Sequence, residues 1–560
     1  MKSRLRYHRR VERTAIENTT YDGDLDMFFD KGFRRRGTAL ATALMLGTSP
    51  ISLGAATPED TLVIAAKIDD IVSIDPAEAF EFNGIDLLNN LYDTLIELDP
   101  EQPGELVPGL AESWDVSEDG LTFTFIMREG VTFASGNPVR AEDAAFSLQR
   151  VVKLNKTPSF ILTQFGFTPE NVGELIVADG NTLRMTIDRP LAPSLVYNCL
   201  TALVAAIVDK ETVMANEVDG DMGYEWMKAN SAGTGAYVLR SYRPSESYLL
   251  EAREGHWRGD ANLRRVFLRH IPEPATQRLM LEAGDVDIAR DLTPVDVEGL
   301  AGNSDVVVTD DVGGYISYIA INGQHEVLAD PAVLDAMRWL IDYEGMAGSF
   351  LKGQQMVHQH FLPRGYLGAL EETPYSLDVE RAKQILADAG IETPINAKLS
   401  VRNSQDRMEM AQSIQNTFAQ AGINIELSVG AGAEVLGEYR ARQHEITLQA
   451  WGPDYPDPHT NASTFAMNPD NSPEAGLTGI LAWRNAWDPG EVHDMTEAAV
   501  MERDTDARRS LYEEIQRRHR DDSPFIAMFQ SIDQTGMRAN VQGFYTGGAI
   551  DSATYWLATK

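Results

Sequence analysis

The sequence predicts a mixed α/β protein with more than one domain, and three observations support this prediction. The chain has 560 residues, which exceeds the size at which a single hydrophobic core stops growing. Residues 121–125 alternate apolar and polar side chains, which is the period of a half-buried strand. Residues 399–429 show the pattern of a strand, a long helix, a glycine stop at Gly422 and a second strand. This last pattern is a βαβ unit, and it indicates an α/β domain between about residues 320 and 520, after a more β-rich part.

Two helices of this α/β domain are predicted by their first residues. Asp330 precedes Pro331, and proline is favoured at the first helical position because it lacks the backbone N–H that would have no partner there. Asp378 precedes a stripe of apolar residues at helical spacing that ends at Gly390. We therefore expect Asp330 and Asp378 to cap helices, and Gly390 to terminate the second one.

Charge and cysteine content exclude several classes of protein. The chain has 48 lysines and arginines against 84 aspartates and glutamates, a formal net charge of −36. The electrostatic field of such a negative chain repels the phosphate backbone of nucleic acids, so nucleic acid is not an expected partner. The single cysteine, Cys199, excludes an intramolecular disulfide and a metal site built from several cysteines.

The amino terminus has the order of a secretory signal peptide. A basic cluster at residues 31–36 is followed by an apolar run at residues 37–47 and then by small residues that include Gly54 and Ala56. This order predicts export, with cleavage after Ala56. The apolar run has about eleven residues, whereas a membrane-spanning helix needs about 20, so a membrane anchor is not expected.

The leading region of this signal is long. Met27 is an alternative start, because the 26 residues before it show no pattern, and residues 1–56 are thus predicted to be a signal peptide with a spurious extension at its beginning. No cysteine stands at the predicted cleavage point to carry a lipid anchor. The mature chain is therefore expected in the periplasm as a soluble protein.

Enzyme and metal motifs occur only as fragments. His325 and His444 each begin an H-E pair like that of a zinc-protease helix, but the second histidine four residues later is missing. His358 and His360 lie at strand spacing and could begin a metal site, yet no third ligand stands near them. We therefore expect no catalytic activity, no metal and no cofactor.

The run from Glu105 to Val151 resembles the signature region of the family 5 extracellular solute-binding proteins, which are the oligopeptide- and dipeptide-binding receptors of ABC importers. The similar motifs are "PGLAESW", "SEDG", "TFTF", "REGVTF", "GNP" and "AEDAAFS". Further similar stretches follow in the family's order, among them "GTGAYVL" at Gly233, "LEAGDVDIA" at Leu281 and "DYPDP" at Asp454. The resemblance covers nearly all of residues 57–560.

This resemblance implies a two-lobed fold like that of the type II periplasmic binding proteins, with an extra subdomain, as in cluster C. Lobe I is expected to comprise residues 57–315 and 526–560, with the extra subdomain at about residues 101–230. Lobe II is expected to comprise residues 316–525. These two names are kept below for these ranges.

The resemblance also implies a function. The chain is expected to cross between the lobes twice, near Tyr318–Asn322 and Ile526–Ser531, and to close on its solute by a hinge motion. A monomeric receptor would bind a small peptide or amino-bearing solute between the lobes. It would then deliver the solute to the permease subunits of an ABC importer in the inner membrane, without chemistry on it.

The stretch "AWGPDYPDPHTN", residues 450–461, is the most informative loop of the sequence. Its three prolines remove backbone donors and disfavour helix in the residues before them, so we expect a shaped loop rather than a helix or a central strand. From its residues alone, Asp454 is either an acceptor within a turn or a fixed charge in a pocket, beside the flat side chain of Trp451. Asp457 precedes Pro458 and is expected to be a turn acceptor that asparagine could replace at little cost.

The resemblance assigns ligand-binding roles to this loop and to residues outside it. Peptide-binding members of the family have a W-x-x-D pattern whose aspartate receives the α-ammonium of the ligand beside an aromatic wall, and the matching residues here are Trp451 and Asp454. A carboxylate in a cleft of low dielectric is a strong partner for an ammonium group. The ligand-binding set expected from the resemblance is Asp454, Trp451, Tyr455, Trp483, Glu81 and Phe82.

Alternative ligands remain open at this point. Some members place a basic residue three positions before the tryptophan to meet the ligand carboxylate, and here that position is Leu448. An oligosaccharide receptor would use Trp451, Tyr455, Trp483 and Trp487 as stacking planes, and a receptor for a metal complex is a further alternative in the same class. A periplasmic hydrolase is the alternative from another class, and it would need a nucleophile and a base in contact within the cleft.

Overall fold

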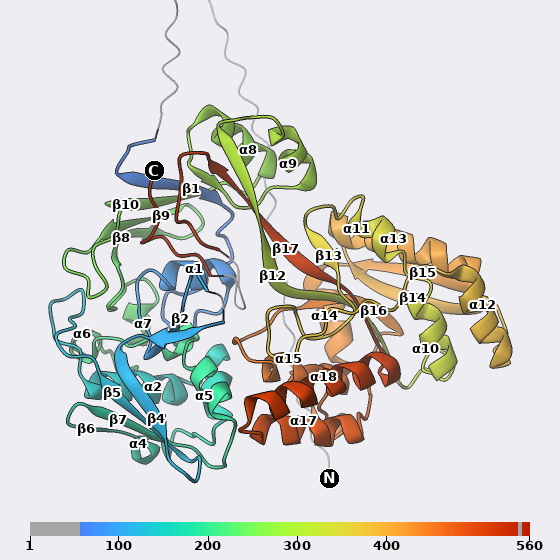
Figure 1. The fold of residues 1–560 in the computed structure, drawn as a ribbon, viewed down its shortest axis with the longest axis horizontal. Coiled ribbons are helices and arrows are strands. Elements are labelled where there is room, and N and C mark those ends of the chain that lie inside the picture. The colour runs from blue at the N-terminus through green and yellow to red at the C-terminus, as the bar shows by residue number, and fades with distance from the viewer. Residues whose placement is uncertain (1–56, 103, 547–551) are drawn as a thin grey trace, which may run out of the picture. The chain divides into compact units, whose positions relative to one another are not determined.

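The structure is a computed structural model that describes residues 57–102, 104–546 and 552–560 (Figure 1). The predicted signal peptide at residues 1–56 lies outside the described residues. Within the described ranges, we find no helix that combines the length and the apolar character needed to cross a membrane.

One large mixed sheet extends through the described chain. Its strand order is β15-β14-β16-β12-β17-β11-β1-β10-β9-β8, and β13 also pairs with β17. The strands are β1 (Thr61–Ala66), β8 (Tyr237–Arg243), β9 (Ser247–Ala252), β10 (Arg265–His270), β11 (Ile288–Ala289), β12 (Val306–Ile321), β13 (Gln355–Val357), β14 (Ile395–Arg402), β15 (Ile423–Gly430), β16 (Ile446–Trp451) and β17 (Phe525–Arg538).

The antiparallel pair of β12 and β17 joins the two ends of this sheet (Figure 1). Its first half pairs Val306 with Arg538 and lies beside β11, whereas its second half pairs Ala320 with Phe525 and lies beside β16. The register shifts between Val312 and Ile316. The two predicted crossing segments thus belong to one strand pair, and the main irregularity of that pair lies a few residues before the first predicted segment.

A smaller sheet with the order β4-β5-β7-β6 lies within the range of the predicted extra subdomain. In β5, Phe123 and Phe125 are fully buried between partly buried neighbours, which confirms the predicted alternation. A two-stranded sheet, β2 with β3, precedes it. The strands of these two sheets are β2 (Ile96–Leu98), β3 (Leu106–Pro108), β4 (Ala111–Val116), β5 (Thr122–Met127), β6 (Ile176–Asp179) and β7 (Thr182–Thr186).

The helices divide between the two predicted lobes. In the range of lobe I they are α1 (Phe82–Leu88), α2 (Ala141–Leu154), α3 (Phe160–Thr163), α4 (Val172–Leu175), α5 (Pro193–Cys199), α6 (Lys210–Ala215), α7 (Tyr224–Met227), α8 (Pro274–Ala283) and α9 (Pro294–Leu300), with short 3-10 turns at Thr157–Ser159 and Leu203–Ala205. In the range of lobe II they are α10 (Pro331–Arg338), α11 (Tyr343–Ala347), α12 (Val379–Asp388), α13 (Gln405–Gln420), α14 (Gly432–Arg440), α15 (His459–Phe465), α16 (Leu481–Arg484), α17 (Glu491–Met501) and α18 (Thr505–Asp522), with a 3-10 turn at Pro473–Ala475.

The predicted caps and the βαβ unit are confirmed. The carboxylate of Asp330 accepts a hydrogen bond from the backbone N–H of Ala332 at 2.9 Å, and that of Asp378 accepts one from the N–H of Arg381 at the same distance. Gly390 follows α12 with a φ of +69°, a conformation that favours glycine. Strands β14 and β15 pair in parallel, and α13 connects them.

Separate hydrophobic cores stabilise the different parts of the chain. The smaller sheet and α2 share one core, β1 with β8, β9 and β10 share a second, and α10, α12 and α13 share a third with β14, β15 and β16. Ile526, Met528 and Phe529 of β17 pack into the third core, so the packing changes from lobe II to lobe I only after Phe529. Tyr455 comes from the range of lobe II but packs into the first core.

Candidate functional site

The loop between β16 and α15 comprises residues 452–458, shorter than the twelve-residue stretch predicted to be loop, because Trp451 ends the strand and His459 begins the helix. Its backbone is held by local hydrogen bonds. The N–H of Asp454 donates to Oγ1 of Thr460 at 2.8 Å, and the N–H of Asp457 donates to the carbonyl of Tyr455 at 2.8 Å. The prediction of a shaped loop is thus confirmed for this central part.

Asp457 has a second role besides the predicted one. Its carboxylate forms a two-armed ion pair with the guanidinium of Arg508 on α18, with N···O distances of 2.7 and 2.8 Å, and both side chains are almost completely buried. Burial alone would raise the pKa of Asp457, but the charge and the hydrogen bonds of Arg508 hold the pKa below its ordinary value. The predicted turn contact is confirmed, since the carboxylate of Asp457 also accepts a hydrogen bond from the N–H of His459 at 2.9 Å. The expectation that asparagine could replace it at little cost is wrong, because the spacing of the prolines indicates the turn but not the buried Arg508.

The same ion pair contacts helix α5 in the range of lobe I. The side-chain amide of Asn198 donates to Asp457 at 3.4 Å, and Arg508 donates to Oγ of Ser194 at 3.0 Å. The loop is therefore fixed from both lobes.

Asp454 borders a cavity of about 190 Å³ whose lining is mostly apolar. Within the described part of the chain, its carboxylate has no hydrogen bond or ion pair, and no other carboxylate belongs to the lining. Burial raises the pKa of Asp454 to about 7. The lining residues are Ala79, Phe80, Phe82, Ile85, Pro158, Ile161, Ala202, Leu203, Val204, Tyr315, Gly452, Pro453 and Asp454.

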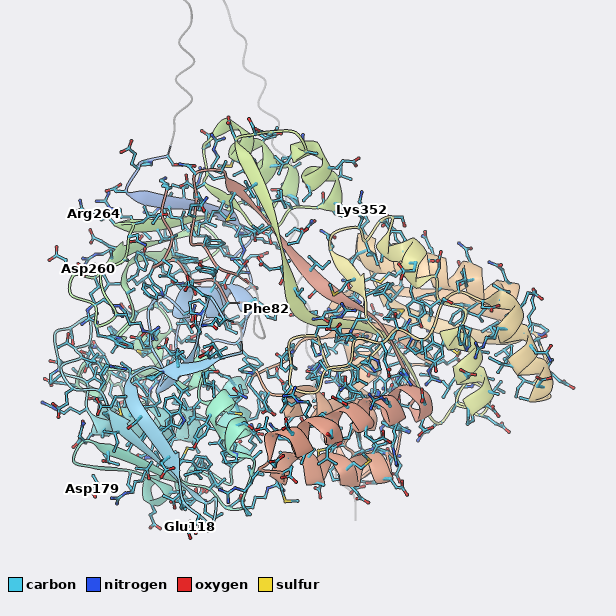
Figure 2. The ribbon with its side chains drawn as sticks, in the orientation of Figure 1. Phe82, Glu118, Asp179, Asp260, Arg264 and Lys352 are labelled. Atoms are coloured by element: carbon cyan, nitrogen blue, oxygen red, sulfur yellow. The ribbon has the colours of Figure 1, made fainter. Side chains whose placement is uncertain are left out.

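An aromatic pair forms part of the wall of this cavity. Phe82, at the start of α1 (Figure 2), lies with its ring centre 5.2 Å from that of Tyr315, at an interplanar angle of 54°. Gly452 lies against the ring of Tyr315, since a Cβ atom at this position would be 3.0 Å from the ring. Tyr315 was not among the predicted site residues, because nothing in its sequence context distinguishes it from a strand residue.

Trp451 does not line this cavity, although the W-x-x-D pattern placed it beside Asp454. Its ring packs against the core formed around α15 and α18, and the guanidinium of Arg484 lies 5.9 Å from its ring centre. Its indole N–H is buried and has no hydrogen-bond partner among the described residues. The aromatic residues that line the cavity with Asp454 are Phe80, Phe82 and Tyr315 instead.

The remaining predicted site residues lie apart from the cavity or at its edge. Tyr455 is buried in the core of the smaller sheet, where its hydroxyl donates to Oε1 of Gln164 at 3.5 Å. Trp483 is buried under the guanidinium of Arg442, and its N–H donates to a backbone carbonyl. Glu81 precedes α1, and its carboxylate accepts a hydrogen bond from the N–H of Phe80. The structure thus brings Phe82 and Asp454 together, with Glu81 adjacent in sequence.

A second cavity, of about 490 Å³, borders the other end of the same loop. Pro456 and Pro458 belong to its lining, together with Gly313 of β12 and Arg364. Arg364 was not predicted to be a site residue, and its position between a proline and a glycine was the only signal in the sequence.

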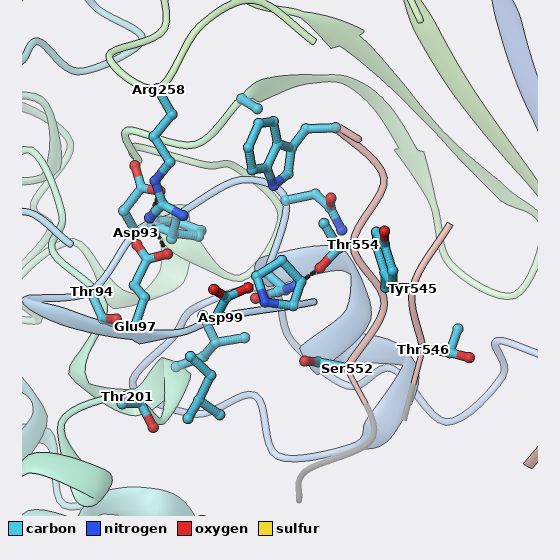
Figure 3. Close-up of a pocket in the computed structure, with 18 of the residues that line it drawn as sticks. Asp93, Thr94, Glu97, Asp99, Thr201, Arg258, Tyr545, Thr546, Ser552 and Thr554 are labelled. Carbon is cyan, nitrogen blue, oxygen red and sulfur yellow. Dashed lines mark hydrogen bonds and ion pairs between the residues drawn. The ribbon is translucent and has the colours of Figure 1, made fainter. Parts of the chain in front are cut away.

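A third cavity, of about 120 Å³, lies in the range of lobe I and is lined mostly by residues with polar side chains (Figure 3). Arg258 forms ion pairs with both Asp93 and Glu97 at its wall (Figure 3). Burial raises the pKa of Glu97 to about 7, against the opposing charge of Arg258. These three charges are thus paired with one another, whereas the carboxylate of Asp99 in the same lining accepts hydrogen bonds from the backbone N–H of Glu101 and the side chain of Gln102.

His358 and His360 are both buried. Nε2 of His358 lies 2.8 Å from the carbonyl of Leu362, and Nε2 of His360 lies 3.0 Å from the carbonyl of Glu372. Burial lowers the pKa values to about 3 and about 4, respectively, so both rings are neutral at pH 7. No group of three or more metal-ligating side chains occurs in the described ranges.

A shaped loop at two cavities, an uncompensated carboxylate and a strand pair that joins the two ends of the large sheet are features that a solute-binding protein needs. Residues 105–473 match the model of the bacterial extracellular solute-binding proteins, family 5 (middle region). The chain belongs to this family, which confirms the resemblance found in the sequence.

Curated relatives match over almost their full length. The chain is 27% identical over 508 residues to a probable D,D-dipeptide-binding periplasmic protein, DdpA, of Escherichia coli, covering 90% of this chain and 94% of that protein. It is 28% identical over 480 residues to di/tripeptide-binding protein 2 of Pseudomonas aeruginosa, covering 81% of this chain and 86% of that protein.

A solved structure with the same fold is the periplasmic binding protein DppA of Helicobacter pylori in complex with the peptide STSA. The two structures superpose with a TM-score of 0.72 at 24% sequence identity. The superposition covers 89% of this chain and 98% of the Helicobacter pylori chain. The fold is thus that of the type II periplasmic binding proteins, as predicted.

The ion pair of Asp457 predicts a large loss of stability when one partner is removed. Asp457→Asn keeps the size of the side chain but leaves the buried Arg508 without a countercharge. We expect the free energy of unfolding to fall by about 3 to 5 kcal/mol. Denaturant unfolding followed by circular dichroism measures this loss, with Asp506→Asn as the control because that carboxylate is 94% exposed. Equal stability of the two variants would contradict the role assigned to the ion pair.

The raised pKa of Asp454 predicts that replacing this aspartate increases stability, whereas replacing Asp457 decreases it. The carboxyl ionises near pH 4 in the unfolded chain and near pH 7 in the folded one, so folding becomes less favourable as the pH rises from 4 to 7, and the penalty is constant above 7. Asp454→Asn should therefore stabilise the ligand-free protein by about 1 to 3 kcal/mol at pH 8. The gain should shrink as the pH falls from 7 to 4.

Thermal and denaturant unfolding of the ligand-free protein between pH 4 and pH 8 measures this dependence. Asp506→Asn again serves as the control, and its stability should follow that of the parent at each pH. A loss of stability for Asp454→Asn at pH 8 would mean that the carboxylate has a stabilising partner.

Proposed function

We propose that this chain is a periplasmic receptor that binds a small peptide or another amino-bearing solute and delivers it to the permease of an ABC importer. The observation that carries the proposal is the carboxylate of Asp454, which borders an apolar cavity and has no partner among the described residues. An ammonium group of a ligand supplies the missing countercharge. In a site from which water is excluded, this contact is much stronger than the same contact in water.

The lining of the cavity supports this assignment. Phe82 and Tyr315 present aromatic surface beside Asp454, and the other lining residues are mostly aliphatic or proline. A ligand with an ammonium group and an adjoining apolar part therefore meets both a charge and a surface of matching chemistry.

The relatives support a peptide as the ligand and a receptor rather than an enzyme as the class. Their names describe a D,D-dipeptide-binding protein and a di/tripeptide-binding protein. Short peptides of L-amino acids and of D-amino acids are therefore both reasonable ligands. The relatives named as periplasmic proteins also support the proposed location, and the predicted export signal agrees with it.

The proposal predicts that the charge of Asp454 dominates ligand affinity. The experiment first selects the strongest binder from a pooled set of di- and tripeptides of L- and D-alanine, leucine and phenylalanine, by retention on the purified protein and mass spectrometry. Calorimetry with that peptide then compares the parent with Asp454→Asn. We expect the variant to lose about 2 to 5 kcal/mol of binding free energy, because the ligand ammonium is left without its partner.

Two controls accompany this comparison. Asp506→Asn should bind like the parent, since its carboxylate is exposed on α18. The N-acetylated form of the selected peptide should bind the parent weakly. If Asp454→Asn binds the peptide as tightly as the parent does, the ligand has no ammonium at this position and the peptide proposal fails.

A further inference from the structure

Two side chains from the range of lobe II are buried in a core that otherwise belongs to lobe I. Tyr455 is 3% exposed and Val500, near the end of α17, is 2% exposed, and both pack into the core that the smaller sheet shares with α2. Val492 and Ala499, on the same helix as Val500, pack into a core of lobe II instead. The burial of Tyr455 and Val500 therefore requires that the two lobes are in contact.

Hydrogen bonds join the same two surfaces. The backbone N–H of Ala192 donates to the carbonyl of Val500 at 2.8 Å, and the guanidinium of Arg503 donates to the carbonyl of Glu118 at 2.9 Å. Ala192 and Val500 are both buried, so water does not compete for the bond between their backbones. Separation of the lobes would thus break a buried backbone hydrogen bond and also expose apolar surface to water.

The cavity of about 490 Å³ is bordered both by this contact and by the strand pair of β12 and β17. Ser194 of α5, which accepts a hydrogen bond from Arg508, belongs to its lining, and so do Gly313 and Gly314 of β12. Figure 1 shows α5 beside the ends of α17 and α18. The strand pair is continuous between the lobes, whereas α5 and α18 are separate elements. The contact at α5 is therefore the part that separates when the lobes move apart.

We call these contacts together the interlobe clasp. It consists of Glu118, Ala192, Ser194 and Asn198 of lobe I with Tyr455, Asp457, Val500, Arg503 and Arg508 of lobe II. None of its contacts involves a ligand, so the free energy that it contributes is available to the empty protein.

We propose that the interlobe clasp holds the ligand-free protein closed, and that solute enters through openings that release Tyr455 and Val500 from the core of lobe I. Burial of these two side chains favours the closed state without help from a ligand, because opening returns them to water. A ligand then adds its own contacts to a closed state that is already populated. The inference goes beyond the proposed function, since it concerns the empty protein and holds for any solute that binds between the lobes.

The single cysteine of the chain reports on the clasp. Cys199 of α5 is completely buried, and its Sγ accepts a hydrogen bond from the side-chain amide of Gln164 at 3.6 Å. Oε1 of the same Gln164 accepts the hydrogen bond of the Tyr455 hydroxyl at 3.5 Å. Burial raises the pKa of the Cys199 thiol, and a buried, protonated thiol reacts slowly with alkylating reagents. Because release of Tyr455 uncovers this region, the rate at which Cys199 is labelled measures opening of the clasp.

The experiment measures labelling of Cys199 by N-ethylmaleimide in the purified protein, after dialysis against mild denaturant has removed any bound solute. Small-angle scattering of the same samples gives the radius of gyration. Val500→Ala weakens the clasp, and Val492→Ala is its matched control, because it removes the same methyl groups from a core of lobe II on the same helix. Tyr455→Ala and Tyr455→Phe form a second pair, in which the phenylalanine keeps the buried ring.

We expect slow labelling in the parent, in Tyr455→Phe and in Val492→Ala, and the same compact radius in all three. Val500→Ala should be labelled about tenfold faster than Val492→Ala, and Tyr455→Ala faster still, because each loses packing across the clasp. Both of these variants should also have a larger radius of gyration. Circular dichroism shows that each variant is folded, and if Tyr455→Ala does not fold, the two valine variants still decide the question.

Three results would overturn the inference. The parent would be open without ligand if its labelling rate and radius already equalled those of Val500→Ala. Equal acceleration in Val492→Ala and Val500→Ala would show that labelling follows general loss of stability. Val500→Ala and Tyr455→Ala that both keep the parent's rate and radius would show that the clasp does not restrain the lobes. No ligand enters the experiment, so these results stand apart from the proposed function.

Discussion

The buried ion pair between Asp457 and Arg508 holds the loop of residues 452–458 against both lobes. Taking two charges out of water is costly, and the cost is offset only because the geometry is two-armed and further groups donate to the carboxylate. This pair fixes the loop near its end at α15, next to Pro456 and Pro458 at one cavity, while Asp454 borders the other.

Three aspartates show how the surroundings of a carboxylate decide its role. Asp457 is matched by an arginine and stabilises the fold. Asp93 is matched by Arg258 and neighbouring donors at the polar cavity of lobe I. Asp454 has no cationic partner among the described residues, and burial raises its pKa to about 7. A ligand ammonium that binds the ionised carboxylate offsets this cost of burying the charge. An unpaired carboxylate at a cavity lowers the stability of the fold, and such destabilising groups are typical of functional sites.

Much of the fold could be predicted because local signals in the sequence agree with it. Asp330 and Asp378 cap helices, Gly422 separates α13 from β15, and the alternation around Phe123 marks a strand. Pairings between residues distant in sequence could not be predicted. Nothing near Asp457 indicates Arg508, and nothing near Asp454 indicates that Phe82 and Tyr315, rather than Trp451, form the adjacent wall.

The central claim is that a ligand ammonium binds the ionised form of a carboxyl group that is largely protonated in the free protein at pH 6. The direct measurement is the number of protons released on binding, obtained by calorimetry at pH 6 in two buffers of different ionisation enthalpy, with a peptide that the receptor retains. A pKa of about 7 for Asp454 predicts the release of close to one proton per ligand, since the peptide amine stays protonated throughout. Binding without any proton exchange at this pH would contradict the account.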